Sequence, residues 1–224
     1  MRLDSDRETQ LRKLHSLTGV VPLGVFLLLH LSINARAMQG RVAFDRMVER
    51  LVSIPLLPLI ELVLVALPLA FHAGYGLYLV YVLRGASEPG KVSPYTKNWV
   101  VLERATGIAA LIFIGFHLYD LRGPVLSGYL VETDVYPKLA AQLSSTTSWG
   151  IPLFALFYLA GVAATVFHFA AGLYAFSVTW GFVQSERAMR VAARACGGLG
   201  ILLFLIGAST VIYYATGSRF FIAG

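Results

Sequence analysis

The amino-acid sequence predicts an all-α integral membrane protein, a five-transmembrane-helix bundle that forms one membrane domain over residues 1–224. Hydrophobic residues make up 57% of the chain and charged residues only 13%, whereas a soluble domain is about one quarter charged. Five apolar segments also reach the length of about 20 residues that a helix needs to cross the hydrocarbon core. These predicted spans are residues 15–36, 54–83, 101–122, 149–183 and 192–216.

Prolines and span lengths predict how these helices deviate from straight rods. Pro22 and Pro68 lie inside spans, where the missing backbone N–H should kink the helix. Pro55 and Pro152 fall where a first helical turn would accept them. The second and fourth spans are longer than the bilayer requires, so we expect them to tilt or to project beyond it.

The basic residues predict the orientation of the chain. Eleven Lys and Arg residues lie on the side of the amino terminus and seven on the opposite side. For a multi-pass protein of the cell inner membrane, this imbalance predicts a cytoplasmic amino terminus and an outer carboxyl terminus. The net charge of +6 does not predict a nucleic-acid partner, because the basic residues lie at span ends. The single cysteine, Cys196, excludes an internal disulfide and an iron–sulfur cluster held by this chain alone.

Each of the first four predicted spans carries one histidine. These residues are His30, His72, His117 and His168. A histidine inside a membrane is costly unless it has a partner, so four of them indicate a function.

An internal repeat links the four spans. Residues 71–78 and 167–174 share the pattern F-H-x-x-x-G-L-Y, on the second and fourth spans. Residues 26–31 and 113–118 share F-x-x-x-H-L, on the first and third spans. A Thr-Gly pair precedes each of the latter two, Thr18-Gly19 in the first span and Thr106-Gly107 in the third. The repeat indicates that the histidines act as pairs.

Depth in the membrane predicts which histidines pair. Counted from the outer span ends at about 1.5 Å per residue, His30 and His117 lie near the outer surface. His72 and His168 lie in the inner half by the same count. Two pairs at two depths predict two stacked haems, each held by two imidazoles, an arrangement that suits electron transfer. The absence of C-x-x-C-H favours b-type haems, which are not attached by thioether bonds.

A histidine-based proton or ion transporter is the competing interpretation. Such relays usually include membrane carboxylates, and Glu61 lies inside a predicted span only near its outer end. A third interpretation is that the four histidines are unrelated and that each bonds to a helix carbonyl. This interpretation would have to explain the repeat and the matching depths.

The four histidines and the K-L-H-S-L-T-G-V stretch at residues 13–20 resemble a known family. It is the di-haem cytochrome b membrane-anchor subunit of succinate dehydrogenases and quinol:fumarate reductases, and the resemblance covers nearly the whole chain. The resemblance implies His72 and His168 as axial ligands of a proximal haem iron. It implies His30 and His117 as ligands of a distal haem iron.

The resemblance also implies partners. On the inner face the chain would anchor an FAD-containing flavoprotein subunit and an iron–sulfur subunit, and it would exchange electrons with a quinone, for which menaquinone is the expected type. The enzyme's dicarboxylate chemistry would belong to the flavoprotein, so no dicarboxylate site is expected in this chain. Contact with membrane lipid is implied, and a higher oligomer of the three-subunit complex is compatible with it. A di-haem, quinol-oxidising anchor of a different membrane dehydrogenase is the alternative.

Three further residues are expected near a quinone or the haem propionates. They are Glu61, His15 and Ser16. His15 and Ser16 are alternatively polar anchors at the membrane surface, and Glu61 is alternatively bonded to a neighbouring helix. Some fumarate reductases of the family carry a glutamate two residues before the second proximal ligand. Val166 occupies that position here, which argues against a proton path of that kind.

Overall fold

Five helices of the computed structural model are long and apolar enough to cross a membrane, as the sequence predicts. The structure describes residues 5–82 and 94–218, and this part of the chain contains no strand. Most of the predicted connection at residues 84–100 lies outside the described residues. The membrane-length helices are Asp6–Gln39, Leu57–Tyr81, Asn98–Leu126, Leu153–Thr179 and Glu186–Thr216.

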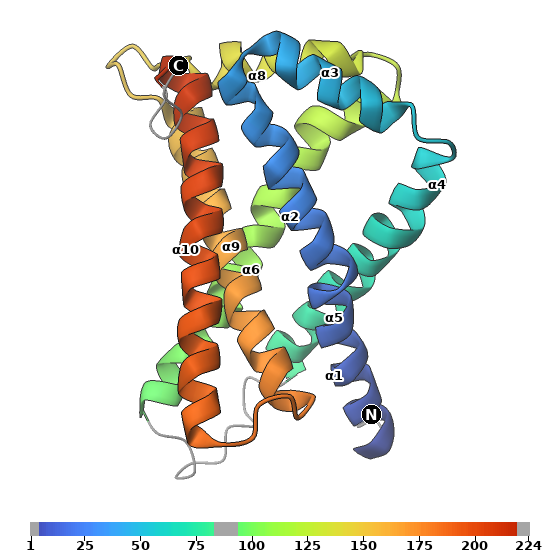
Figure 1. The fold of residues 1–224 in the computed structure, drawn as a ribbon, viewed down its shortest axis with the longest axis vertical. Helices are drawn as coiled ribbons and strands as arrows, with labels where there is room; N and C mark the ends of the chain where they lie inside the picture. The colour runs from blue at the N-terminus through green and yellow to red at the C-terminus, as the bar shows by residue number, and fades with distance from the viewer. Residues whose placement is uncertain (1–4, 83–93, 219–224) are drawn as a thin grey trace. The chain divides into compact units, whose positions relative to one another are not determined.

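The first membrane-length helix is two α-helices in succession. Helix α1 (Ser5–Val20) and helix α2 (Pro22–Asn34) follow one another along one rod and are separated at Val21 (Figure 1). The interruption lies at Pro22, which has no N–H to continue the ladder of backbone hydrogen bonds.

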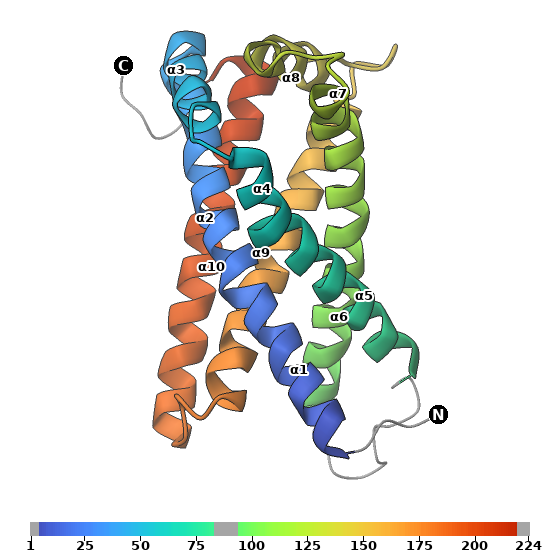
Figure 2. The same cartoon turned by 90° about the vertical axis from the view of Figure 1, so that its right-hand side faces the viewer.

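The second membrane-length helix contains a π turn. Helix α4 (Leu57–Glu61) passes through the π turn Leu62–Ala66 into helix α5 (Leu67–Val82) (Figure 2). Pro68 lies two residues beyond the turn, and it cannot donate to the carbonyl of Leu64 inside that turn. A π turn is a common local adjustment in a helix whose regular bonding is interrupted.

The third membrane-length helix also contains a π turn, near its carboxyl-terminal end. Helix α6 (Pro94–His117) continues through the π turn Leu118–Arg122 into the short helix α7 (Gly123–Leu126). Pro124 lies just beyond the π turn, so the carbonyl of Asp120 loses its usual N–H donor.

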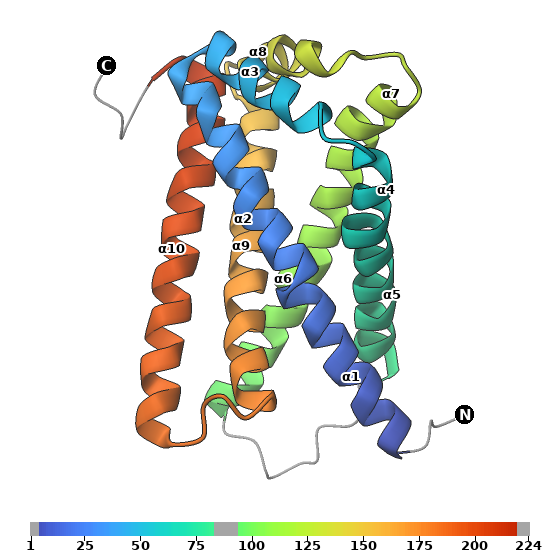
Figure 3. The same ribbon diagram turned by 45° about the vertical axis from the view of Figure 1, so that its right-hand side comes forward.

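Helices α9 (Leu153–Thr179) and α10 (Glu186–Thr216) run without interruption (Figure 3). Gly181 ends α9 with a backbone φ of 77°, a left-handed conformation that favours glycine. Its N–H donates to the carbonyl of Val178, which satisfies part of the helix end.

The chain forms two compact units. The first unit comprises the described residues of Met1–Leu27, Pro58–Ile108 and Phe167–Gly200. The second unit comprises those of Leu28–Leu57, Ala109–Val166 and Ile201–Gly224.

Two amphipathic helices, α3 (Arg41–Val52) and α8 (Val135–Leu143), belong to the second unit and pack against each other. Phe44 of α3 is 3% exposed, and its ring lies 5.7 Å from that of Tyr136. Tyr136 in turn lies 5.2 Å from the ring of Tyr214 on α10. These aromatic contacts tie α3 and α8 to the end of a membrane-length helix.

Candidate functional site

His72 on α5 and His168 on α9 face each other within the first unit. Their ring centroids lie 6.1 Å apart and their planes cross at 75°. Two imidazoles on one metal ion have two bonds of about 2 Å each and roughly 1 Å more to each ring centre, which gives about 6 Å between centroids. The observed separation therefore fits two axial ligands of one metal ion.

The hydrogen bonds of these two rings fix their tautomers. His72 Nδ1 lies 2.9 Å from the carbonyl oxygen of His15, and His168 Nδ1 lies 3.1 Å from that of Glu103. A carbonyl only accepts, so each Nδ1 carries the proton and each Nε2 keeps its lone pair. Metal-binding histidines usually donate their second ring N–H in this way, which fixes the ring's orientation.

Two glycines make room for these rings on the neighbouring helices. A Cβ on Gly19 would lie 2.5 Å from His72 Cε1, and a Cβ on Gly107 would lie 2.8 Å from His168 Cε1. Each glycine follows the accepting carbonyl by four residues, so it lies one helical turn further along the same face. The Thr-Gly pairs of the repeat therefore mark the positions where α1 and α6 receive the histidines of α5 and α9.

His15 also contacts His72 through its side chain. The two rings stack with centroids 4.1 Å apart and an interplanar angle of 7°. Tyr75 lies 5.7 Å from the His15 ring, and its hydroxyl is buried without a hydrogen-bond partner among the described residues. The structure thus places His15 beside a predicted haem ligand.

Two small residues follow His168 on α9. Ala170 and Ala171 are 8% and 3% exposed, and among the described residues of the first unit they are the buried apolar side chains. Several large apolar side chains of this unit are more than half exposed, such as Leu64 and Leu67. The buried apolar side chains of this unit are therefore small ones that follow His168 on α9, which would let a broad planar group approach that helix.

His30 on α2 and His117 on α6 form the corresponding pair of the second unit. Their ring centroids lie 5.7 Å apart, with planes at 89°. The Asn34 amide lies 3.3 Å from His30 Nε2 and donates to the His30 carbonyl at 2.8 Å. His117 Nδ1 is buried and has no hydrogen-bond partner among the described residues.

Aromatic side chains enclose His117. The rings of Phe113 and Tyr158 lie 5.8 and 6.0 Å from it. Tyr158 is only 5% exposed, and its buried hydroxyl also lacks a partner in the described part of the chain. Two unsatisfied polar atoms in one buried region are unusual in a folded protein and indicate a ligand or bound water.

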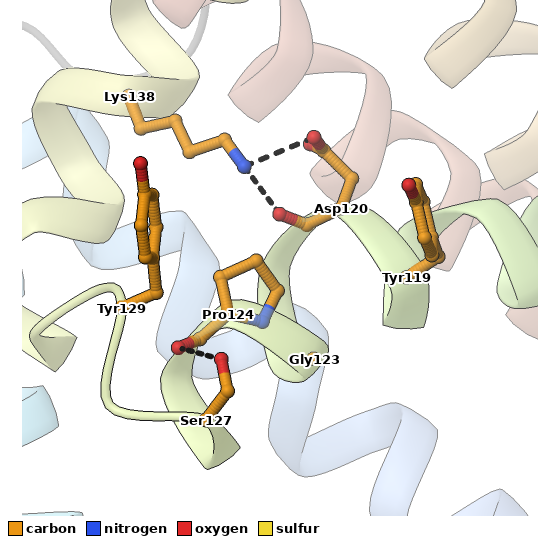
Figure 4. Close-up of a pocket in the computed structure, with 7 residues that line it drawn as sticks. All are labelled: Tyr119, Asp120, Gly123, Pro124, Ser127, Tyr129 and Lys138. Atoms are coloured by element: carbon orange, nitrogen blue, oxygen red, sulfur yellow. Dashed lines mark hydrogen bonds and ion pairs between the residues drawn. The ribbon is translucent and has the colours of Figure 1, made fainter.

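A pocket of about 350 Å³ lies beside the π turn of the third membrane-length helix (Figure 4). Lys138 of α8 donates to the carbonyl of Asp120, and its Nζ lies 2.9 Å from Asp120 Oδ1. Pro124, four residues further on, cannot donate the regular helix hydrogen bond to this carbonyl. Lys138 therefore replaces the missing helix hydrogen bond.

The remaining predicted site residues occupy different surroundings. Ser16 accepts a hydrogen bond from Trp180 Nε1 at 3.1 Å and donates to the Lys13 carbonyl at 2.9 Å. Glu61 lies at the end of α4, eleven residues or roughly 16 Å of helix before His72. The structure thus brings His15 to the His72 pair but not Glu61. A quinone or propionate contact for Glu61, His15 and Ser16 stays a prediction.

The sequence did not predict the roles of Gly19, Gly107 and Glu103. The repeated Thr-Gly pairs were a visible signal, but their partners are far away in the sequence. The Nδ1 bonds of His72 and His168 span 57 and 65 residues.

Comparison with known proteins gives the family. No family model matches the chain. The chain is 35% identical over 213 residues to the succinate dehydrogenase cytochrome b558 subunit of Bacillus subtilis strain 168. The alignment covers 95% of this chain and 100% of that relative. With its five membrane-length helices, the chain is a multi-pass membrane protein that belongs to the family of succinate dehydrogenase cytochrome b subunits.

Proposed function

We propose that this chain is the electron-transferring membrane anchor of a succinate:quinone oxidoreductase and holds two haems b. His72 and His168 would bind the proximal haem iron, and His30 and His117 the distal one. The chain would carry electrons between an iron–sulfur subunit and a quinone, with menaquinone the expected type.

The matched tautomers of His72 and His168 are the observation that carries this proposal. Each ring donates Nδ1–H to a helix carbonyl, which leaves two Nε2 lone pairs on rings whose centroids lie 6.1 Å apart. A haem iron with two imidazole ligands supplies one-electron transfer and has no open position for oxygen chemistry. The protein's task is then to hold both rings in place and to exclude water around them.

Buried polar atoms without hydrogen-bond partners around His30 and His117 support a second haem in the second unit. His117 Nδ1 and the Tyr158 hydroxyl have no partner in the described structure. The Asn34 amide faces His30 Nε2, so iron binding at this nitrogen requires the amide to turn away. Its shorter bond to the His30 carbonyl can keep Asn34 anchored during that change.

The partners follow from the family. The relative is named as a subunit of succinate dehydrogenase, which supports an FAD-containing flavoprotein and an iron–sulfur protein as partners of this chain. The excess of Lys and Arg on the side of the amino terminus supports a cytoplasmic amino terminus in the inner membrane. The soluble partners would then bind on the cytoplasmic side.

Purification of the native complex tests the proposal. We expect a b-type α-band in the reduced-minus-oxidised spectrum, reduction of haem by succinate, and a co-purifying flavoprotein. A different oxidoreductase in its place would favour the alternative dehydrogenase anchor, and a preparation without a b-type band would refute the haem sites.

His15 provides a matched control within the same site. Its backbone carbonyl, and not its imidazole, accepts the hydrogen bond from His72 Nδ1. We therefore expect His15→Ala to retain both haems and His72→Leu to lose one. Equal haem loss in both variants would show that the His15 ring is itself required for binding.

A further inference from the structure

Thr18 shares an acceptor with a predicted haem ligand. Its hydroxyl donates to the carbonyl oxygen of His15 at 2.9 Å, and His72 Nδ1 donates to the same oxygen at 2.9 Å. In an α-helix this oxygen also receives the N–H of the residue four positions later, here Gly19. Three donors therefore converge on an oxygen that has two lone pairs.

Thr106 repeats this arrangement on α6. Its hydroxyl lies 3.0 Å from the Glu103 carbonyl oxygen, which also receives His168 Nδ1 at 3.1 Å. The same hydroxyl lies 2.8 Å from the Leu102 carbonyl, so it divides its proton between two acceptors. The threonine follows the shared carbonyl by three residues in both halves of the repeat.

We propose that Thr18 and Thr106 are positioning residues that set the reduction potential of the haem held by His72 and His168. This inference rests on the proposed haem ligation. Competition from the hydroxyl weakens the bond from Nδ1–H to the carbonyl. A weaker bond leaves the imidazole less basic, and the basicity of a ligand affects the potential of its metal.

The direction of the effect follows from this competition. Removing the hydroxyl frees the carbonyl, strengthens the Nδ1–H bond and makes the imidazole a stronger donor, which favours oxidised iron. For Thr18→Val we expect the ratio of reduced to oxidised haem at a fixed ambient potential to fall about threefold, or about 28 mV at 59 mV per tenfold. Thr106→Val should shift the same haem in the same direction but less, because its hydroxyl is divided between two carbonyls.

A redox titration of the intact complex, followed by optical spectroscopy, tests the proposal. Thr18→Ser keeps the hydroxyl and should restore the wild-type potential. Thr210→Val is the matched control, because its hydroxyl donates to the Ile206 carbonyl at 2.9 Å in the second unit. We expect only one of the two haems to shift in the Thr18 and Thr106 variants, and neither in the control.

Haem potentials and haem content in the Thr18 and His72 variants decide between the possible outcomes. Unchanged potentials in Thr18→Val with both haems bound, a shift to higher potential, or equal shifts of both haems would overturn the proposal. Loss of one or both haems in Thr18→Val would also overturn it, because a stronger imidazole donor should hold the iron more tightly. If His72→Leu retains both haems, the ligation itself is wrong. If His72→Leu loses one haem while Thr18→Val is unshifted, only the role of the threonines fails.

Discussion

Replacing Gly19 with alanine should selectively weaken one haem site. The added methyl would lie 2.5 Å from His72 Cε1 and 2.9 Å from Nδ1, whereas carbon atoms in contact lie about 3.5–4.0 Å apart. The imidazole must therefore retreat by about 1 Å. This movement would lengthen the 2.9 Å bond to the His15 carbonyl beyond the limit of a hydrogen bond. Loss of such a partner typically lowers metal affinity by about 10–100-fold.

Haem titration into the purified, haem-depleted chain measures this effect. We expect Gly19→Ala to weaken one of two binding steps by about 10–100-fold and to leave the other unchanged. Gly107→Ala should have a smaller effect, since its added Cβ would lie 2.8 Å from His168 Cε1. Gly198→Ala is the control, because a Cβ there has no atom within 4 Å. Wild-type affinity at both steps in Gly19→Ala would refute the reasoning.

Two further predictions concern stability in the second unit. Lys138→Met should lower the free energy of unfolding by about 1–3 kcal/mol, because the Asp120 carbonyl loses its donor. This loss of stability should be smaller in a Pro124→Ala background, because the backbone N–H at that position can then donate to that carbonyl. A double-mutant cycle of thermal unfolding measures the difference, and an equal loss of stability in both backgrounds would contradict the prediction. Gly161→Ala should cost about 1–3 kcal/mol, because the new methyl would overlap the Phe113 ring. An unchanged midpoint of thermal unfolding would show that the ring can move aside.

The helices and the interruption at Pro22 could be predicted because they depend on local chemistry. Apolar runs of sufficient length predict the five membrane-length helices, and these are present. Pro22 interrupts its helix because the residue itself lacks an N–H, a property visible in the sequence. The π turns before Pro68 and Pro124 could not be predicted, because a helix that contains a proline can kink, end or widen into a π turn.

The pairing of the histidines could be predicted from their depth, and the structure brings the same partners together. Their ligation of haem stays a prediction. The carbonyls that fix the tautomers of His72 and His168 could not be identified, because contacts between helices decide which backbone atoms meet a side chain. The stacking of His15 on His72 depends on tertiary packing in the same way.

Counting haem in paired variants tests the central claim most directly. If His72 and His168 hold one haem and His30 and His117 hold the other, the wild-type chain contains two haems. The double variants His72→Leu/His168→Leu and His30→Leu/His117→Leu should each retain one, whereas His72→Leu/His117→Leu should retain none. One haem in the wild-type chain, or a haem retained in the last variant, would contradict the pairing.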